Sequence, residues 1–289
     1  MRDALVIRDR ILSTAERAAR ERTATARQEM LRIAVAGAGP SGVEVASEIH
    51  GLLTRILPRY YGVMEPPVVS VYQRSNRILP GWDPVLAAEG LDVLRARGVD
   101  VHLEVGVTSF RDNVLEVTAN GGGVTSVPAS TLVWTAGTEP VTQFRDDTRL
   151  PRGDRNHLVV DQYLRVDSHQ NIYAVGDVAQ VARRAGGGFQ PPVAPIAISA
   201  GVRAAGNIEN AIMGRGLEPF DAHHAGKIVS LGNGTALVDL LGWRVRGRPA
   251  WWMYRTVYLL KLVGMKNKLQ AMANLTLNRI FEPALDCDG

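Results

Sequence analysis

LRIAVAGAGPSG, residues 31–42, is the stretch that decides the fold of this 289-residue chain. A short apolar run with the β-branched residues Ile33 and Val35 leads into a Gly-x-Gly-x-x-Gly turn, and apolar residues at helical spacing follow it. A glycine string between a strand and a helix indicates a dinucleotide-binding unit. Gly37 permits the tight turn, Gly39 lets the backbone approach a pyrophosphate, and Gly42 lets the helix pack on the strand.

The helix that opens at Pro40 and Ser41 would offer free N–H groups and a partial positive charge to the phosphates. A glycine-rich loop without a ligand is the alternative interpretation. Because the glycines lie between a predicted strand and a predicted helix, the sequence favours nucleotide binding.

The segments after this turn complete one α/β domain. The helix is predicted to end at Pro58 and to carry the apolar stripe Val45, Ile49, Leu52 and Ile56. A helix is also predicted at residues 83–98, and strands are predicted at residues 68–72, 101–104, 107–110, 114–119 and 132–137. This β-α-β start with an antiparallel excursion predicts a Rossmann-type nucleotide-binding domain at residues 29–139.

Three further segments are predicted around that domain. Residues 1–28 have the pattern of an amphipathic connecting helix, and they have no surface of their own to pack against. Residues 140–220 contain a loop-forming stretch and a helix at 196–210. Residues 221–289 contain a hairpin around residues 232–234 and then apolar, aromatic and basic helices.

The end of the second strand bears on the choice between NADH and NADPH. An acidic residue there would accept hydrogen bonds from the ribose 2′-OH of NAD, but the sequence has Gln73, followed by Arg74 and Arg77. A missing carboxylate with arginines nearby suits a 2′-phosphate, because Arg binds phosphate bidentately. The sequence therefore favours a site that tolerates NADPH, with merely solvated arginines as the alternative.

Composition excludes several classes of protein. The single cysteine, Cys287, excludes an internal disulfide and a redox Cys pair, so a disulfide reductase is not expected and a reducing, cytoplasmic compartment fits. None of the six histidines has the spacing of a zinc site, so no metal is predicted. No apolar run reaches the ~18 residues that a membrane-spanning helix needs.

The order of motifs resembles that of the type II NADH dehydrogenases, which are single-chain, FAD-containing, membrane-peripheral NADH:quinone oxidoreductases of the pyridine nucleotide-disulphide oxidoreductase superfamily. The resemblance runs over nearly the whole chain. It is carried by residues 7–10 (IRDR), 37–48 (GAGPSGVEVASE), 77–80 (RILP), 133–137 (VWTAG), 164–177 (LRVDSHQNIYAVGD) and 250–268.

The resemblance implies FAD and NADH or NADPH as cofactors, together with a set of site residues. Gly176 and Asp177, at the end of a buried strand predicted at residues 172–175, would contact FAD. Glu44 would lie near the place where nicotinamide meets flavin, and a first-turn acid stabilised by the helix dipole is the alternative. The cofactor site would also include Ala136, Gly137 and Ala194.

Two departures from the family pattern affect these expectations. The family begins with a FAD-binding Gly-x-Gly-x-x-Gly unit of its own, which this chain is expected to lack. The family's quinone-side helix reads Ala-Gln-x-Ala-x-Gln-Gln-Gly, whereas residues 194–201 read APIAISAG, without the three glutamines. Quinone or a similar small electron acceptor is therefore implied by the resemblance and not by these residues.

The C-terminal stretch combines aromatic, apolar and basic residues, among them Trp251, Trp252, Tyr254, Tyr258 and Arg255. Trp and Tyr favour the membrane–water boundary, and long cations can reach lipid headgroups. We therefore expect amphipathic helices that bind a membrane surface, with packing on another domain or on a homodimer partner as the alternative. The expected location is cytoplasmic and peripheral, on the inner face of the cell membrane, and no nucleic acid partner is expected.

Residues and resemblance together predict an enzyme. It would be a FAD-dependent NAD(P)H dehydrogenase that passes a hydride from NAD(P)H to FAD and electrons to a quinone or similar acceptor. The alternative from another class is a catalytically inactive, NAD(P)-binding, membrane-associated remnant or fragment of such an enzyme.

Overall fold

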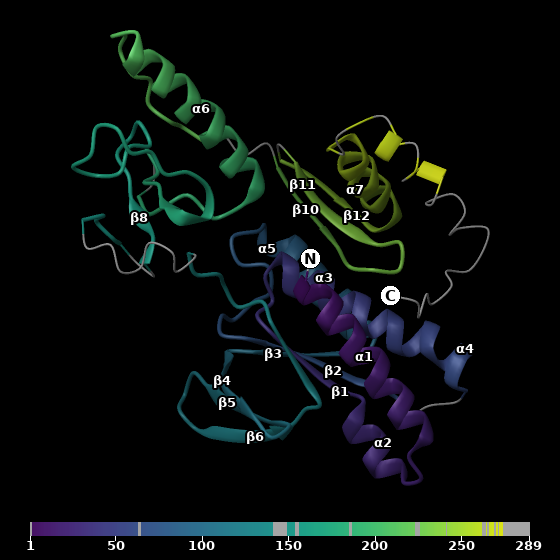
Figure 1. Ribbon diagram of the computed structural model, residues 1–289. Helices are drawn as coiled ribbons and strands as arrows, with labels where there is room; N and C mark the ends of the chain where they lie inside the picture. Colours follow the sequence, from purple (N-terminus) through teal and green to yellow (C-terminus); the bar gives the residue numbers. More distant parts are fainter. Residues whose placement is uncertain are drawn as a thin grey trace. The chain divides into compact units, whose positions relative to one another are not determined.

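The computed structural model describes residues 2–62, 65–140, 149–153, 156–184, 187–222, 226–240 and 242–261, and parts of 264–273. Its contacts divide the chain into two compact units (Figure 1). Unit 1 comprises Met1–Ala136 together with Gly226–Gly289, and unit 2 comprises Gly137–Ala225. Unit 1 is thus built from two stretches of sequence, with the residues of unit 2 between them.

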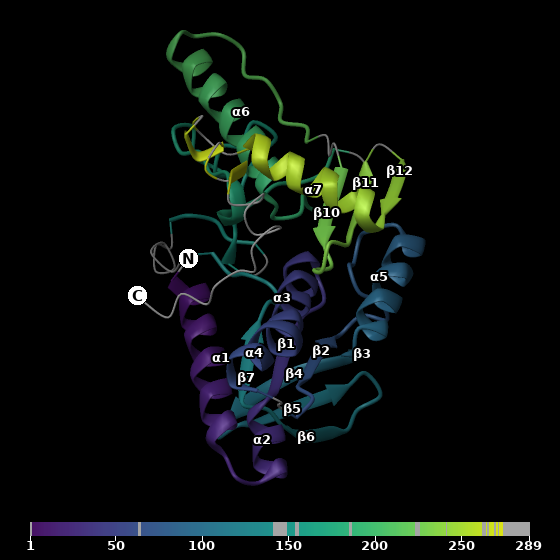
Figure 2. The same ribbon diagram turned by 90° about the vertical axis from the view of Figure 1, so that its right-hand side faces the viewer.

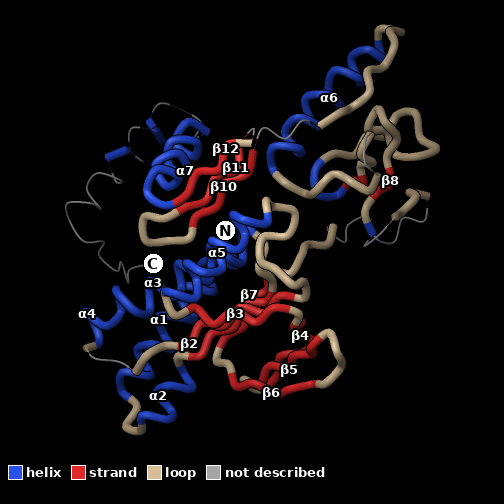
Figure 3. Tube along the Cα trace, turned by 180° about the vertical axis from the view of Figure 1, so that it is seen from behind, coloured by secondary structure: helices blue, strands red, loops and turns tan. Residues whose placement is uncertain are grey.

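A four-stranded parallel sheet forms the centre of unit 1. Its order is β3-β2-β1-β7, and its strands are β1 (Arg32–Ala36), β2 (Val68–Gln73), β3 (Val99–Leu103) and β7 (Thr131–Trp134). Figure 3 draws the strands in red and the helices in blue. β1 is parallel to both neighbours and pairs Ile33 with Val69 on one side and with Thr131 on the other. The predicted α/β fold class with a Rossmann-like sheet is confirmed.

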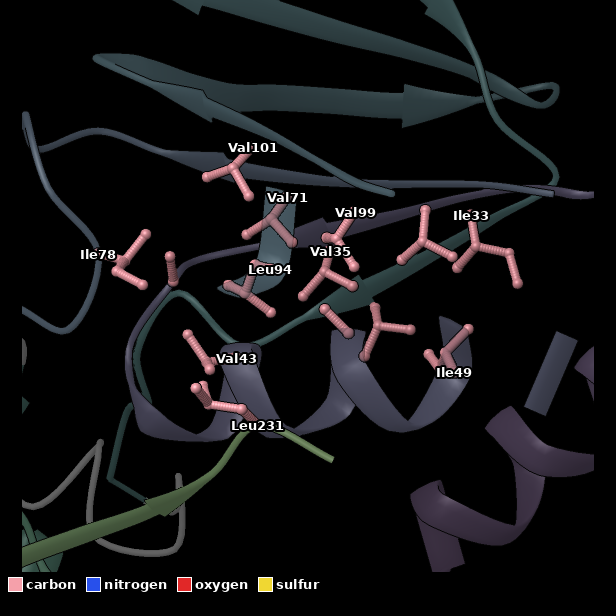
Figure 4. Packing of buried hydrophobic residues seen from close by; sticks show 14 of the residues in the cluster. Ile33, Val35, Val43, Ile49, Val71, Ile78, Leu94, Val99, Val101 and Leu231 are labelled. Atoms are coloured by element: carbon pink, nitrogen blue, oxygen red, sulfur yellow. The ribbon is translucent and has the colours of Figure 1, made fainter. Parts of the chain in front are cut away.

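One face of this sheet packs against two helices, α3 (Pro40–Gly51) and α5 (Pro84–Ala96). Because side chains alternate along a strand, every second residue of β1, β2 and β3 faces these helices. Val35 of β1, Val43 of α3 and Leu94 of α5 are fully buried in the same cluster (Figure 4). This cluster keeps α3 directly behind the glycine turn.

The helical stretch after the glycine turn is longer than predicted. α3 continues into a π-helical turn, η1 (Leu52–Ile56), and then into α4 (Leu57–Tyr61), which ends at Gly62. The predicted end at Pro58 is wrong, because Pro58 lies in the first turn of α4, where no intrahelical partner for its nitrogen is needed. The buried residues of this stretch include Val43, Ala46, Ile49, Leu53 and Leu57, so only Ile49 of the predicted stripe is buried.

The opposite face of the sheet is partly covered by an antiparallel meander. Its strands, β4 (Val105–Arg111), β5 (Val114–Ala119) and β6 (Val124–Pro128), lie in sequence order. Leu115 of β5 is fully buried in a cluster with Tyr72 of β2. The antiparallel excursion predicted before the last strand is thus present.

The N-terminal residues form two helices that belong to unit 1, α1 (Arg2–Arg20) and α2 (Ala24–Met30). Ala15 of α1 is fully buried in the same cluster as the central sheet. Arg10 donates hydrogen bonds to the Ser130 carbonyl at 2.7 Å and to Thr131 Oγ1 at 3.1 Å. The expectation that this segment has nothing to pack on is wrong, because its apolar side lies against the sheet-and-helix core.

The second stretch of unit 1 is a three-stranded antiparallel sheet followed by a helix (Figure 2). These elements are β10 (Gly226–Ser230), β11 (Ala236–Leu240), β12 (Trp243–Arg246) and α7 (Gly247–Lys261). The predicted hairpin is present, and β12 was not predicted. Val229, Leu231 and Leu237 belong to the central cluster, so this sheet packs on α3 and α5.

Unit 2 has little regular secondary structure among its described residues. It contains β8 (Leu158–Val159), β9 (Ala179–Gln180), the 3₁₀ helix η4 (Gly176–Val178) and α6 (Ala194–Ile212). The strand predicted at residues 172–175 is wrong: only Tyr173 forms a bridge, with Arg165. The backbone there bonds to the neighbouring loop, where the Ala174 N–H donates to the Leu164 carbonyl at 3.1 Å, so no ladder extends.

Candidate functional site

The glycine turn between β1 and α3 passes very close to the end of β7. Gly37 has a φ of 98°, which favours glycine, and its N–H donates to the Tyr72 carbonyl at 2.8 Å. A Cβ on Gly37 would lie 2.9 Å from the Cα of Ala136. Thr135 and Ala136 follow β7 directly and lie beside the turn, and the next residue, Gly137, begins unit 2; Ala136 and Gly137 are both exposed.

Gly42 lets α3 approach the strand, as predicted. A Cβ at this position would lie 1.9 Å from the Gly37 carbonyl oxygen and 2.7 Å from Thr135 Oγ1. The Thr135 hydroxyl in turn donates to the Ala36 carbonyl at 2.7 Å. Backbone from β1, the turn and β7 therefore converges on the buried Gly42 in the first turn of α3.

Gly39 is the N-cap of α3, and no side chain caps it. A Cβ on Gly39 would have no atom within 4 Å, so open space adjoins the backbone at this point. Pro40 and Ser41 follow in the first turn, where helix N–H groups have no intrahelical partner. An uncapped helix N-terminus beside open space can bind a phosphate group.

Gln73, at the end of β2, braces the turn. Its Oε1 accepts a hydrogen bond from the Ala38 N–H at 2.7 Å, and its Nε2 donates to Ser75 Oγ at 2.6 Å. The Ser75 hydroxyl donates to the Arg77 carbonyl at 2.8 Å. The position expected to contact ribose therefore also fixes the shape of the glycine turn.

Arg74 and Arg77 are both exposed at this end of β2. Arg74 lies along β4, where a Cβ on Gly106 would meet its Nε at 2.7 Å. The structure thus brings Gln73, Arg74 and Arg77 together beside the turn.

Glu44 lies in the second turn of the same helix and is half-buried. Its Oε1 accepts a hydrogen bond from the backbone N–H of Ser230 at 3.0 Å. Burial raises the pKa of Glu44, whereas the Ser230 N–H and the Tyr254 phenol lower it and the neighbouring Glu48 raises it. The carboxyl is thus held between α3, β10 and α7.

Sequence reasoning missed the two residues that face Glu44. Ser230 acts through its backbone, which no residue pattern reveals. Tyr254 was singled out only as part of an aromatic stretch, although its ring lies 4.6 Å from that of Tyr258, one helical turn later on α7. Burial, followed by the nearby Glu44, raises the pKa of Tyr254, so the phenol keeps its proton at neutral pH.

Unit 2 contains the other predicted cofactor residues. Gly176 has a φ of 74° and Asp177 is exposed on η4. A Cβ on Gly176 would lie 3.6 Å from the Cβ of Ala197, in the first turn of α6. Gly176, Asp177 and Ala197 line one small cavity, and Ala194 begins α6, whose N-terminus has no side-chain cap.

Neither a metal centre nor a membrane span is found among the described residues. They contain no group of three or more His, Cys, Asp or Glu side chains that could hold a metal ion. No helix in this part of the chain combines the length and apolar character that crossing a bilayer requires. His223, His224, Cys287 and most of the second predicted C-terminal helix lie outside the described residues.

Comparison with known proteins gives a consistent result. The model of the pyridine nucleotide-disulphide oxidoreductase family matches residues 3–201. A type II NADH:quinone oxidoreductase of Mycobacterium tuberculosis, NdhA, is 27% identical over 282 residues, which cover 93% of this chain and 58% of that protein. The external alternative NAD(P)H-ubiquinone oxidoreductase B2 of Arabidopsis thaliana is 32% identical over 187 residues, 63% of this chain and 32% of that protein.

A solved structure shares the fold. The NDH2 protein of Plasmodium falciparum, in complex with NADH, superposes with a TM-score of 0.87 at 17% identity over 96% of this chain and 72% of that one. The chain spans less than two thirds of the length of each of the two relatives above.

Proposed function

The chain belongs to the pyridine nucleotide-disulphide oxidoreductase family, and on that premise we propose that unit 1 binds NAD(P)H for a flavin-dependent dehydrogenase. The observation that carries the proposal is the glycine turn. Gly42 is packed against Gly37 and Thr135, while Gly39 borders open space at an uncapped helix N-terminus. That arrangement suits a dinucleotide pyrophosphate.

The first turn of α3, Gln73 and Glu44 have different roles in this proposal. The amides of the first turn of α3 bind the pyrophosphate, while Gln73 keeps the Ala38 amide and the turn in place. Glu44 lies further along the same helix, where it faces the nicotinamide end of the nucleotide. A carboxyl with a raised pKa can exchange a proton or accept a hydrogen bond at that end.

NADPH is tolerated beside NADH in this proposal. The end of β2 carries an amide in place of a carboxylate, so no negative charge repels a 2′-phosphate. Arg74 and Arg77 lie exposed next to it. Turnover with NADPH below about one hundredth of the turnover with NADH would contradict this tolerance. Such a ratio corresponds to about 2.7 kcal/mol of difference in activation free energy between the two nucleotides.

FAD is the proposed hydride acceptor. When bound, it supplies the two-electron chemistry that links NAD(P)H to a further acceptor. Gly176, Asp177 and Ala194 fit one part of such a group, since an exposed carboxylate suits hydroxyl groups and an uncapped helix N-terminus suits electron-rich atoms. Their task is to bind and orient it.

A quinone is the proposed final acceptor, following the printed activities of the relatives. Contact with a membrane surface on the inner face of the cell membrane is proposed for the outer side of the C-terminal sheet and helix. Trp243, Trp252 and Leu260 of these elements are more than half exposed. Arg248 is an exposed cation near Trp243 in sequence, while Arg244 and Arg246 pair with Asp83 and Glu89 of unit 1. The proposal keeps the predicted domain limits at residues 28, 139 and 220. It also keeps a homodimer as the oligomeric state.

A pair of measurements tests the nucleotide site. Gly39 has φ −69° and ψ −179°, which any residue adopts, so Gly39→Ala leaves the free protein intact. If a pyrophosphate approaches this backbone, the added methyl group weakens NADH and NADPH binding at least about tenfold. Fluorescence titration of the parent chain and of Gly39→Ala with NADH and NADPH checks this. Unchanged affinity in Gly39→Ala, or no affinity in the folded parent chain, contradicts the proposal.

A second candidate function is nucleotide binding without electron transfer. It is favoured by the fact that, of the three predicted FAD-contacting residues, only Gly176 and Asp177 line the small cavity of unit 2, whereas Ala194 does not. Flavin absorbance at about 450 nm in the purified protein separates the two functions, because it comes from the cofactor itself. A colourless protein that binds NADPH supports the second.

A further inference from the structure

The turn of the C-terminal hairpin, residues 231–235, is fastened to two helices of unit 1. Arg97, at the end of α5, donates to the carbonyls of Leu231 and Gly232 and to Thr235 Oγ1, the last at 2.7 Å. Arg55, on η1, donates to Asn233 Oδ1 at 2.6 Å. Two guanidinium groups therefore occupy most of the acceptors on this turn.

The same turn also packs tightly against α3. A Cβ on Gly232 would lie 3.2 Å from the Cβ of Ser47, one turn after Glu44. Leu231 is fully buried in the central cluster, and its N–H donates to the Thr235 carbonyl at 2.9 Å. The turn therefore packs against α3 without room for a further methyl group unless a neighbouring atom moves.

Ser230, the residue before this turn, gives its backbone N–H to Glu44 at 3.0 Å. The Ser230 hydroxyl accepts from the Gly232 N–H at 3.1 Å, which ties the donor of Glu44 to the clamped turn. We propose that Arg97 is a positioning residue of the nucleotide site, which fixes the turn so that the Ser230 amide stays against Glu44. This inference rests on the proposed function for the part that places Glu44 at the nicotinamide.

Other titratable groups near Glu44 also affect its pKa, and their influence must be separated from that of the Ser230 N–H. Glu48 faces it from α3, and Tyr254 and Tyr258 face it from α7. Arg55 and Arg97 lie next to His50, whose pKa is lowered first by burial and then by these two cations. Arg97 interacts electrostatically with Glu48, which itself raises the Glu44 pKa, so the test uses variants that keep the positive charge at position 97.

Arg97→Lys keeps the charge and loses the forked geometry, and Thr235→Val removes one acceptor while keeping the shape of the side chain. Arg95→Lys, on the exposed side of the same helix, is the matched control. In protein labelled with ¹³C at the glutamate carboxyls, Glu44→Gln identifies the Glu44 signal. We expect the Glu44 pKa to rise in both test variants, because the Ser230 N–H lowers it.

Hydrogen exchange provides the second readout. The Ser230 amide should exchange at least about tenfold faster in Arg97→Lys and Thr235→Val than in the parent chain, and at the parent rate in Arg95→Lys. An unchanged Glu44 pKa together with unchanged Ser230 exchange in both test variants overturns the proposal. NADH titration of the parent chain is done in parallel. A folded parent chain that binds no nucleotide refutes the proposed function, whereas the Glu44 pKa and the Ser230 exchange rate still test whether Arg97 positions the Ser230 amide.

Discussion

Gly42 tolerates no larger side chain in this fold. An added Cβ would lie 1.9 Å from the Gly37 carbonyl oxygen, which is backbone and can move only if the turn moves. We expect Gly42→Ala to lower the free energy of unfolding by about 1–3 kcal/mol and to weaken NAD(P)H binding. Urea unfolding and fluorescence titration check both effects.

The contrast with Gly39→Ala makes that prediction specific. Gly39 has space for a methyl group and Gly42 has none. The first substitution should therefore affect binding alone, and the second should affect binding and stability. Equal stability of the two variants would show that α3 can move away from the strand.

Glu44 makes stability depend on pH in a defined direction. Its pKa is raised above the ordinary 4.5 mainly by burial, so the folded state holds the proton more tightly than the unfolded state does. Stability contributed by the protonated form is complete below the unfolded pKa and is lost as pH rises through the folded pKa.

Glu44→Gln removes this dependence, which gives a direct measurement. Urea unfolding of the parent chain, compared with that of Glu44→Gln at several pH values from 4 upwards, should show the parent losing stability relative to the variant. The loss should end above the folded pKa. A parent that gains stability over the variant in this interval would contradict the burial of the carboxyl.

α5 shows how a local sequence signal defines an element. Asp83 accepts hydrogen bonds from the N–H groups of Val85 at 3.0 Å and Leu86 at 3.2 Å, and Pro84 begins the helix. The sequence predicted this start because Asp followed by Pro is typical of a helix N-terminus. Asp83 also pairs with Arg244 at 2.7 Å, which joins α5 to β12.

The N-cap of α5 should stabilise unit 1 by about 1 kcal/mol. Asp83→Ala loses the cap and the ion pair, whereas Asp83→Asn loses only the ion pair because Asn also caps helices. Thermal unfolding should therefore place Asp83→Asn above Asp83→Ala. If the two variants unfold at the same temperature, the cap contributes nothing.

Elements that depend on distant partners were harder to predict. From sequence alone, Pro58 is expected to end the helix. In the structure the π-helical turn Leu52–Ile56 precedes it, and Pro58 then lies in the first turn of α4, where proline is tolerated. Residues 172–175 have the composition of a strand, but a strand forms only where a neighbour can pair with it along its length. Burial of Ala15 on α1 likewise depends on a surface that only the folded sheet provides.

The parallel sheet and the glycine turn were predictable because strand, turn and helix follow one another within residues 31–51. The surroundings of Glu44 were not, because its partner Ser230 comes 186 residues later. Local patterns carry no information on which segments far apart in sequence will meet. The candidate site was thus half predicted: the glycine turn and the C-terminal hairpin were each predicted, but the packing of the hairpin against Glu44 was not.

The C-terminal stretch contributes to the core of unit 1 as a whole. Leu231 and Leu237 are fully buried against the first stretch, whereas Leu240 is about one third exposed. Leu237→Ala should cost about 2–5 kcal/mol of unfolding free energy, and Leu240→Ala should cost much less. Urea unfolding distinguishes the two variants; equal losses would mean that β11 does not pack on the helices.

Removing everything after Ala225 is the stronger test of the same idea. Because each buried aliphatic side chain contributes about 2–5 kcal/mol, the loss of Val229, Leu231 and Leu237 together should be comparable with the ~5–15 kcal/mol that stabilises an ordinary domain. The shortened chain should bind a hydrophobic dye and unfold without a cooperative transition. A sharp transition at the parent temperature would refute this role of the C-terminal sheet.

In the sequence, the two stretches of unit 1 lie on either side of unit 2, and this order affects folding during translation. Translation releases the stretch that ends at Ala136 first, then the 89 residues of Gly137–Ala225, and only afterwards the hairpin that covers α3 and α5. At ~5–20 residues per second, the apolar flank of those helices stays uncovered for several seconds during translation. Newly synthesised chains should therefore need chaperones most in that interval, before β10 and β11 emerge.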